Sequence, residues 1–151
     1  MHIQVGIITI SDRASAGEYD DLGGPALKEI AQKIGWHVLA EAIVPDETRR
    51  IQETIQSFSM QGCGLILTTG GTGIGERDVT PEAIRAMMRV ELPGFGEVMR
   101  AESMKITPTR FSHATWPQWW IELWSSRCQG NLAALWNVSA LCKAQSRMAL
   151  Q

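Results

Sequence analysis

Two aspartates lie in polar loops where their carboxylates could bind a metal ion and take part in catalysis. Asp46 follows an apolar segment, and Asp78 follows a glycine-rich segment. Two carboxylates beside a loop that binds phosphate suit Mg²⁺, a hard cation that takes oxygen ligands and bridges nucleotide phosphates. Aspartate also forms turns and caps helices, and Asp46 could cap a helix that begins near Thr48. This structural alternative is weaker for Asp78, because Thr80 is already placed to cap the next helix.

The segment before Asp78 is rich in glycine and could hold an anion. Residues 68–73 read Thr-Thr-Gly-Gly-Thr-Gly and follow a short apolar segment. Glycine lets backbone N–H groups approach an anion closely, although such a segment is often only a tight turn. It is neither a Walker loop, since no Gly-Lys-Ser/Thr follows, nor a GxGxxG motif. Together with the first polar residue after residues 1–10, the candidate ligand-binding residues are Ser11, Thr69, Gly70, Gly71, Thr72 and Gly73.

Histidine and cysteine add little to these candidate sites. None of the three histidines lies in a candidate loop of the first 108 residues, so a Ser/His/Asp triad has no support. The three cysteines form no CxxC pair, and a small buried or half-buried apolar side chain is their ordinary interpretation. These residues are His2, His37, His113, Cys63, Cys128 and Cys142.

Apolar periodicity predicts the strands and helices that position the loops. Strands are predicted over residues 1–10, 36–44 and 64–68, helices over residues 25–34, 48–60 and 81–90, and a loop over residues 11–24. This alternation predicts an α/β fold with a mainly parallel sheet and helices on both faces. Ligands bind beyond the carboxyl ends of the strands in such sheets. We therefore expect the polar segments 11–13, 45–47 and 69–78 to converge at one edge of the sheet.

The composition is that of one folded domain. Of the 151 residues, 44% are hydrophobic and 20% are charged, which excludes an intrinsically disordered chain. The formal net charge of −2 gives no general attraction to nucleic acid. No apolar run approaches the roughly 18 residues of a membrane span, and no signal peptide is recognisable. We therefore expect a cytoplasmic protein that binds neither nucleic acid nor a membrane.

Six segments give the chain a resemblance to a known family. Residues 3–108 resemble the molybdenum-cofactor biosynthesis family, whose molybdopterin-binding fold is shared by bacterial molybdopterin adenylyltransferase and the amino-terminal domain of gephyrin. The matching segments are Thr-Ile-Ser-Asp-Arg at 9–13, Gly-Glu-Tyr-Asp-Asp-Leu-Gly-Gly-Pro at 17–25, Val-Pro-Asp at 44–46, Thr-Thr-Gly-Gly-Thr-Gly at 68–73, Arg-Asp-Val-Thr-Pro-Glu-Ala at 77–83 and Pro-Gly-Phe-Gly at 93–96. One such motif is weak evidence, whereas six in the family's order are specific.

The resemblance implies a fold, a reaction and roles for the site residues. It implies a three-layer α/β/α fold, commonly trimeric, and a reaction in which molybdopterin and Mg-ATP give adenylylated molybdopterin and pyrophosphate. By their motifs, Asp46 and Asp78 would be the functional carboxylates, with Mg²⁺ near them. The loop 70–73 would hold the terminal phosphate of the pterin. The resemblance also implies a partner protein that inserts molybdenum.

Two alternatives to an adenylyltransferase remain open. One is a relative that binds molybdopterin or its precursor and performs a different catalytic step. The other is a non-catalytic pterin-binding module. The second alternative depends on the carboxyl-terminal segment, which departs from the family.

Residues 110–151 differ from the rest of the chain. They hold five of the six tryptophans but one acidic residue, Glu122, and are too few for a second domain without metals or disulfides. The family's Ala-x-Leu-Ser-Arg segment and Leu-Pro-Gly-x-Pro loop do not follow Thr109. Codons read from the third base of codon 109 permit both, so we expect a frame-shifted tail behind an incomplete molybdopterin-binding domain, residues 1–109. The alternative is a native tail whose tryptophans cover an apolar face or contact a partner or membrane.

Overall fold

The structure, a computed structural model, describes residues 3–71, 77, 79–90, 94, 97 and 121–122. Strands and helices alternate along this part of the chain, as expected from the sequence. In chain order they are β1 (Gln4–Ile10), α1 (Asp12–Ser15), α2 (Gly23–Lys33), β2 (His37–Val44), α3 (Thr48–Met60), β3 (Leu65–Gly70), α4 (Thr80–Arg85) and β4 (Ile121–Glu122).

The sheet brings the carboxyl ends of three strands to the same level. Its strand order is β2-β1-β3-β4, and β1 pairs in parallel with both β2 and β3, whereas β4 pairs antiparallel with β3. This confirms the expected α/β fold with a mainly parallel sheet. Ile10, the last residue of β1, pairs with Val44 of β2 and with Gly70 of β3. The loops that follow these strands therefore begin beside one another.

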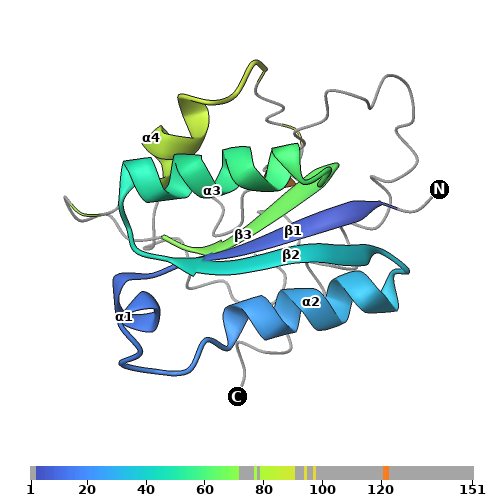
Figure 1. Ribbon diagram of the computed structural model, residues 1–151, viewed down its shortest axis with the longest axis horizontal. Helices are drawn as coiled ribbons and strands as arrows, with labels where there is room; N and C mark the ends of the chain where they lie inside the picture. The colour runs from blue at the N-terminus through green and yellow to red at the C-terminus, as the bar shows by residue number, and fades with distance from the viewer. Residues whose placement is uncertain are drawn as a thin grey trace.

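Helices cover both faces of the sheet (Figure 1): α1 and α2 lie on one face, and α3 and α4 lie on the other. The central strand supplies both sides of the core, since neighbouring residues Ile7 and Ile8 are buried in opposite apolar clusters. Ile7 packs in the cluster that contains Leu27 and Ile30 of α2, and Ile8 packs in the one that contains Ile51 of α3. The alternation of strand side chains thus fixes the three layers.

The helix α3 matches its prediction at both ends, residues 48 and 60. Its buried residues Ile51, Ile55 and Phe58 recur at the three- and four-residue spacing of one helix face. Phe58 packs so closely on β1 that a Cβ at Gly6 would lie 2.4 Å from its ring. A glycine at this position of β1 therefore allows α3 to approach the sheet.

Two predictions for residues 11–34 need correction. The predicted loop contains the short helix α1, because the hydroxyl of Ser11 accepts a hydrogen bond from the backbone N–H of Ala14 and caps it. The helix α2 begins at Gly23, two residues before Pro25, which was predicted at its first position. The carboxylate of Asp21 accepts hydrogen bonds from the N–H groups of Gly23 and Gly24 and so stabilises this earlier start.

Two further predictions of helix ends are also corrected. The helix α4 ends at Arg85 rather than near residue 90, and its N-cap is Val79 rather than Thr80. Thr80 is instead the first residue of the helix, and it is buried, 1% exposed, beside Gly71. At the start of α3, the N-cap is Glu47, without a side-chain capping bond, rather than Asp46. No helix among the described residues is long and apolar enough to cross a membrane.

Candidate functional site

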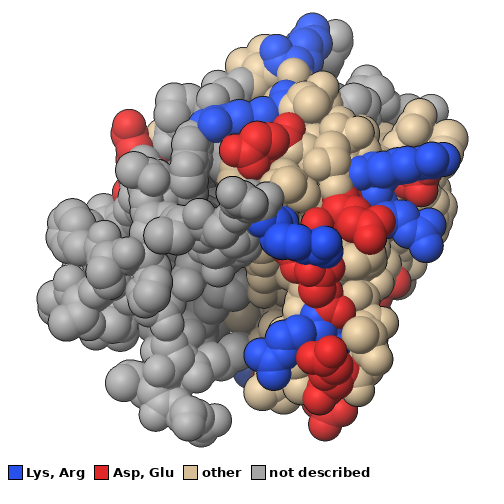
Figure 2. Space-filling view, turned by 90° about the vertical axis from the view of Figure 1, so that its left-hand side faces the viewer, with Lys and Arg blue, Asp and Glu red and all other residues tan. Residues whose placement is uncertain are grey.

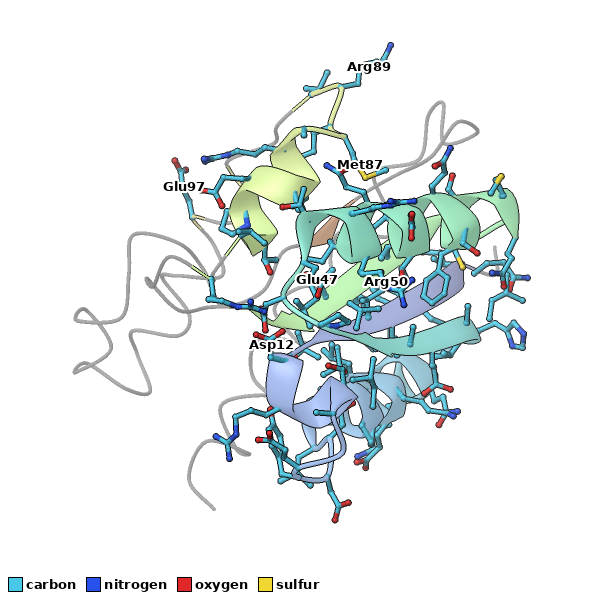
Figure 3. The ribbon with its side chains drawn as sticks, turned by 60° about the vertical axis from the view of Figure 1, so that its left-hand side comes forward. Asp12, Glu47, Arg50, Met87, Arg89 and Glu97 are labelled. Carbon is cyan, nitrogen blue, oxygen red and sulfur yellow. The ribbon has the colours of Figure 1, made fainter. Side chains whose placement is uncertain are left out.

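Two aspartates from neighbouring strand ends bind each other's backbone. Asp12 follows β1 after one residue, and Asp46 follows β2 after one residue. The N–H of Asp12 donates to Oδ2 of Asp46 at 2.9 Å, and the N–H of Asp46 donates to Oδ1 of Asp12 at 3.0 Å. Figure 3 shows Asp12 at the same end of the sheet as Glu47, the residue after Asp46. The polar segments 11–13 and 45–47 thus converge, as expected.

Arg77, which lies after the glycine-rich segment in the sequence, contacts the Asp12–Asp46 pair. Its guanidinium Nη2 donates to Oδ2 of Asp12 at 2.8 Å, across 65 residues of sequence. The arginine side chain is 70% exposed and the aspartate side chain is 40% exposed. Asp12 therefore uses one carboxylate oxygen for Asp46 and the other for Arg77. Neither Asp12 nor Arg77 was among the candidate residues, although both lie in the motifs singled out above.

The glycine turn at the end of β3 requires its glycines. Gly70 and Gly71 have φ angles of 84° and 58°, a conformation that residues with a side chain rarely adopt. A Cβ at Gly70 would lie 2.0 Å from the carbonyl oxygen of Ile10, and one at Gly71 would lie 2.1 Å from Oγ1 of Thr80. The backbone therefore turns sharply at the end of β3, the end of the sheet at which Asp12 and Asp46 also lie. Such a turn can present N–H groups to an anion.

The hydroxyls of Ser11 and Thr69 have surroundings that the sequence did not reveal. Oγ of Ser11 accepts from the N–H of Ala14 at 3.2 Å and lies 2.9 Å from the hydroxyl of Tyr19, with which it shares a hydrogen bond. Thr69 is 4% exposed, and its hydroxyl faces the amino end of α2, where a Cβ on Gly23 would lie 2.7 Å from it. Their assignment as ligand-binding residues stays a prediction.

Three of the candidate residues lie outside the described part of the chain. They are Thr72, Gly73 and Asp78. Their described neighbours are Gly71 on one side, and Arg77 and Val79 on the other. The convergence of the segment 69–78 with the other two loops is therefore observed at its two ends only.

A magnesium ion at this site would have to take most of its ligands from water and phosphate. Among the described residues, no three His, Cys, Asp or Glu side chains gather as a metal-binding group. Both oxygens of Asp12 accept hydrogen bonds, and Oδ2 of Asp46 accepts from the N–H of Asp12. Mg²⁺ commonly binds through one or two carboxylates together with water and substrate phosphates. One ligand from Asp46 and a second from Asp78 would meet that need.

The surface around the strand ends carries both signs of charge. Figure 2 shows acidic and basic side chains interleaved on the side of the molecule where α1 lies. On α3, the hydrogen bond between Arg49 and Glu53 is the main cause that lowers the pKa of Glu53 and raises the pKa of Arg49. Both side chains are exposed, as are most partners of the described ion pairs. The described part of this surface is therefore not uniformly basic.

Comparisons with known proteins identify the relatives of this chain. The family model described as "Probable molybdopterin binding domain" matches residues 6–137. The chain is 46% identical over 111 residues to a molybdopterin adenylyltransferase from Haemophilus influenzae, and 44% identical over 110 residues to one from Escherichia coli K12. Each alignment covers 71% of this chain. The chain spans 56% of the length of each of these two relatives.

Solved structures show the same fold. The molybdopterin biosynthesis enzyme MoaB from Thermus thermophilus has a TM-score of 0.65 at 39% identity, over 71% of this chain and 68% of its own. A tungsten cofactor synthesizing protein from Pyrococcus furiosus has a TM-score of 0.72 at 27% identity, over 99% of this chain and 95% of its own. The chain is thus similar to these proteins in both sequence and fold.

Proposed function

Because the chain belongs to the molybdopterin-binding domain family of molybdenum cofactor biosynthesis, we propose that it is an adenylyltransferase that joins AMP to molybdopterin. In this reaction, the terminal phosphate of molybdopterin attacks the α-phosphorus of ATP. A new phosphoanhydride bond forms, the bond between the α- and β-phosphates breaks, and pyrophosphate leaves. The relatives that support this proposal are named molybdopterin adenylyltransferase.

One observation carries the proposal: the glycine turn of β3 and the Asp12–Asp46 pair lie at the same end of the sheet. Ile10 pairs with both Val44 and Gly70, so the turn and Asp46 follow strand ends that are level with each other. An anion-binding backbone and a carboxylate are the two features that a phosphate acceptor and Mg-ATP need side by side. This supports a site in which the pterin phosphate and the nucleotide phosphates meet.

The proposed roles of the residues follow from this placement. The backbone N–H groups of the loop 70–73 hold the terminal phosphate of molybdopterin, and Ser11, Thr69 and Thr72 line the site. Asp46 and Asp78 would hold Mg²⁺, which when bound offsets the negative charge that develops on pyrophosphate. The protein orients two phosphate groups for in-line attack and needs no covalent enzyme intermediate.

The remaining parts of the proposal concern assembly and location. We propose a cytoplasmic homotrimer that passes adenylylated molybdopterin to a protein that inserts molybdenum. The resemblance of residues 3–108 to the family supports these assignments. Size measurement by light scattering tests the trimer, and copurification with a molybdenum-inserting protein tests the transfer.

A second candidate function is a non-catalytic molybdopterin-binding module. It is favoured by the departure of the residues after Thr109 from the segments that the family carries there. We propose that residues 110–151 are an atypical, frame-shifted tail behind the domain 1–109. The family's Leu-Pro-Gly-x-Pro loop would then be missing from the chain as written.

The two candidates are separated by one assay. The purified chain is incubated with molybdopterin, Mg²⁺ and ATP, and pyrophosphate is measured with and without the pterin. An adenylyltransferase releases pyrophosphate only when molybdopterin is present, and the Asp78→Asn variant releases none. A binding module gives no pyrophosphate but still binds molybdopterin in calorimetry.

A further inference from the structure

We infer that Asp12 and Arg77 are positioning residues that hold Asp46 in register with the glycine-rich loop. This inference rests on the proposed function, because it concerns the same site. It adds a role for two residues that the family motifs contain but that the reaction as proposed above does not use. The contacts of Asp12 with Asp46 and with Arg77 support this role.

Asp12 is the residue that connects three segments of the chain. Its backbone N–H donates to the carboxylate of Asp46 at 2.9 Å. Its Oδ1 accepts from the backbone N–H of Asp46 at 3.0 Å. Its Oδ2 accepts from Nη2 of Arg77 at 2.8 Å. A displacement of Arg77 would therefore pull on the same carboxylate that fixes the backbone of Asp46.

The contact between Arg77 and Asp12 also bears on Asp78, because Arg77 and Asp78 are neighbours in the sequence. Arg77 directly precedes Asp78, the second proposed carboxylate, and follows the glycine-rich segment. Fixing Arg77 to Asp12 therefore limits how far Asp78 can lie from Asp46. Phosphoryl transfer depends on such placement, since a misplacement of about 1 Å can cost about a hundredfold in rate.

The exposure of the ion pair argues against a mainly structural role. The Arg77 and Asp12 side chains are 70% and 40% exposed, and ion pairs between exposed groups contribute little to folding stability. Loss of the pair should therefore leave the melting temperature nearly unchanged. Its effect should be seen in the rate of transfer instead.

A double-mutant cycle on the full chain tests the inference. The variants are Arg77→Gln, Asp12→Asn and the combination of both, and Asn retains an oxygen that can accept from the N–H of Asp46. We expect each single change to lower kcat about tenfold, with KM for ATP and molybdopterin within about twofold of wild type. The double variant should be no slower than either single variant.

The control is an arginine whose ion pair lies elsewhere. Arg49→Gln removes the hydrogen bond to Glu53 on α3, and should leave kcat and KM unchanged. A rise in KM in Arg77→Gln that persists in the Asp12→Asn background would show that Arg77 contacts substrate directly. That result, or losses that multiply in the double variant, would overturn the positioning role.

A second measurement does not depend on activity. Amide hydrogen exchange of Asp12 and Asp46, followed by NMR without ligand, should be about threefold or more faster in Arg77→Gln than in wild type. Unchanged exchange at both amides would overturn the inference. If the wild-type chain transfers no AMP, the proposed function fails, whereas this exchange comparison still decides whether Arg77 holds the pair.

Discussion

Asp12 and Asp46 exchange hydrogen bonds reciprocally, each carboxylate accepting from the backbone N–H of the other, at 2.9 Å and 3.0 Å. They follow adjacent parallel strands, whose last residues Ile10 and Val44 are paired. This exchange fixes the loop after β1 to the loop after β2. It holds the carboxylate of Asp46 against the loop after β1, the strand that lies between β2 and β3.

Asp46→Asn should retain the fold and lose adenylyl transfer. Asparagine keeps one oxygen that can accept from the N–H of Asp12, but it lacks the charge that a metal ion requires. We expect kcat to fall by about a hundredfold or more, and the melting temperature to stay near that of wild type. The control Asp46→Ala also removes the acceptor and should cost about 1–2 kcal/mol of folding stability. Wild-type turnover in a folded Asp46→Asn protein would reject the catalytic role.

Gly71→Val should abolish molybdopterin binding. A Cβ at this position would lie 2.1 Å from Oγ1 of Thr80, and a β-branched residue disfavours the φ angle of 58°. The matched control is Gly35→Val, since Gly35 also has a positive φ angle, 85°, but no atom within 4 Å of its added Cβ. Calorimetry should show binding lost in the first variant and kept in the second. Unchanged affinity in Gly71→Val would count against the glycine turn as the phosphate site.

Asp21→Ala should destabilise the domain by about 2–3 kcal/mol. The Asp21 carboxylate accepts from the hydroxyl of Thr9 at 2.7 Å and from the N–H groups of Gly23 and Gly24, at 2.9 Å and 3.1 Å. Alanine would remove the acceptor of the Thr9 hydroxyl on β1 and of the two N–H groups at the start of α2. Asp20→Ala, at the exposed neighbouring residue, should change stability by less than about 0.5 kcal/mol. Equal denaturation midpoints for the two variants would contradict this cap.

Some of this architecture could be predicted from the sequence because it depends on local periodicity. The spacing of Ile51, Ile55 and Phe58 defines α3 to the residue, and the apolar run before Ser11 defines β1. The ends of β1 and β2, and Asp46 after β2, follow from the same patterns. The prediction for β3 was wrong at its end, because the strand continues to Gly70 rather than ending at residue 68. In these elements, the buried residues are the ones whose apolar spacing in the sequence predicts burial.

The rest depends on contacts between residues far apart in the sequence. The helix α1 has only four residues, too few for periodicity to detect, and it is defined by the Ser11 cap. The ion pair between Arg77 and Asp12 spans 65 residues, and no local rule pairs them. The start of α2 at Gly23, beside the Asp21 carboxylate, was missed because Pro25 gave a stronger start signal two residues further along the chain.

The reading frame of the tail after Thr109 can be tested by comparing two versions of the protein. A version of the chain that continues in the frame from the third base of codon 109 should be soluble, unfold cooperatively and transfer AMP. The chain as written should be less stable, because residues 110–151 would not have been selected to pack on the sheet of residues 1–108. Limited proteolysis and thermal melts of the two versions test this. If the written chain protects its tail and the reframed chain does not fold, the tail is native.

The most direct test of the proposed adenylyl transfer follows the α-phosphate of ATP. The chain, in both reading frames of its tail, is incubated with molybdopterin, Mg²⁺ and ATP labelled at the α-phosphate, and the pterin product is isolated and analysed by mass spectrometry. The proposal predicts that the label enters the pterin together with an added AMP mass, one label for each pyrophosphate released, and that Asp46→Asn abolishes this transfer. An unlabelled pterin in both versions, with molybdopterin bound but unchanged, would contradict it and leave a binding module.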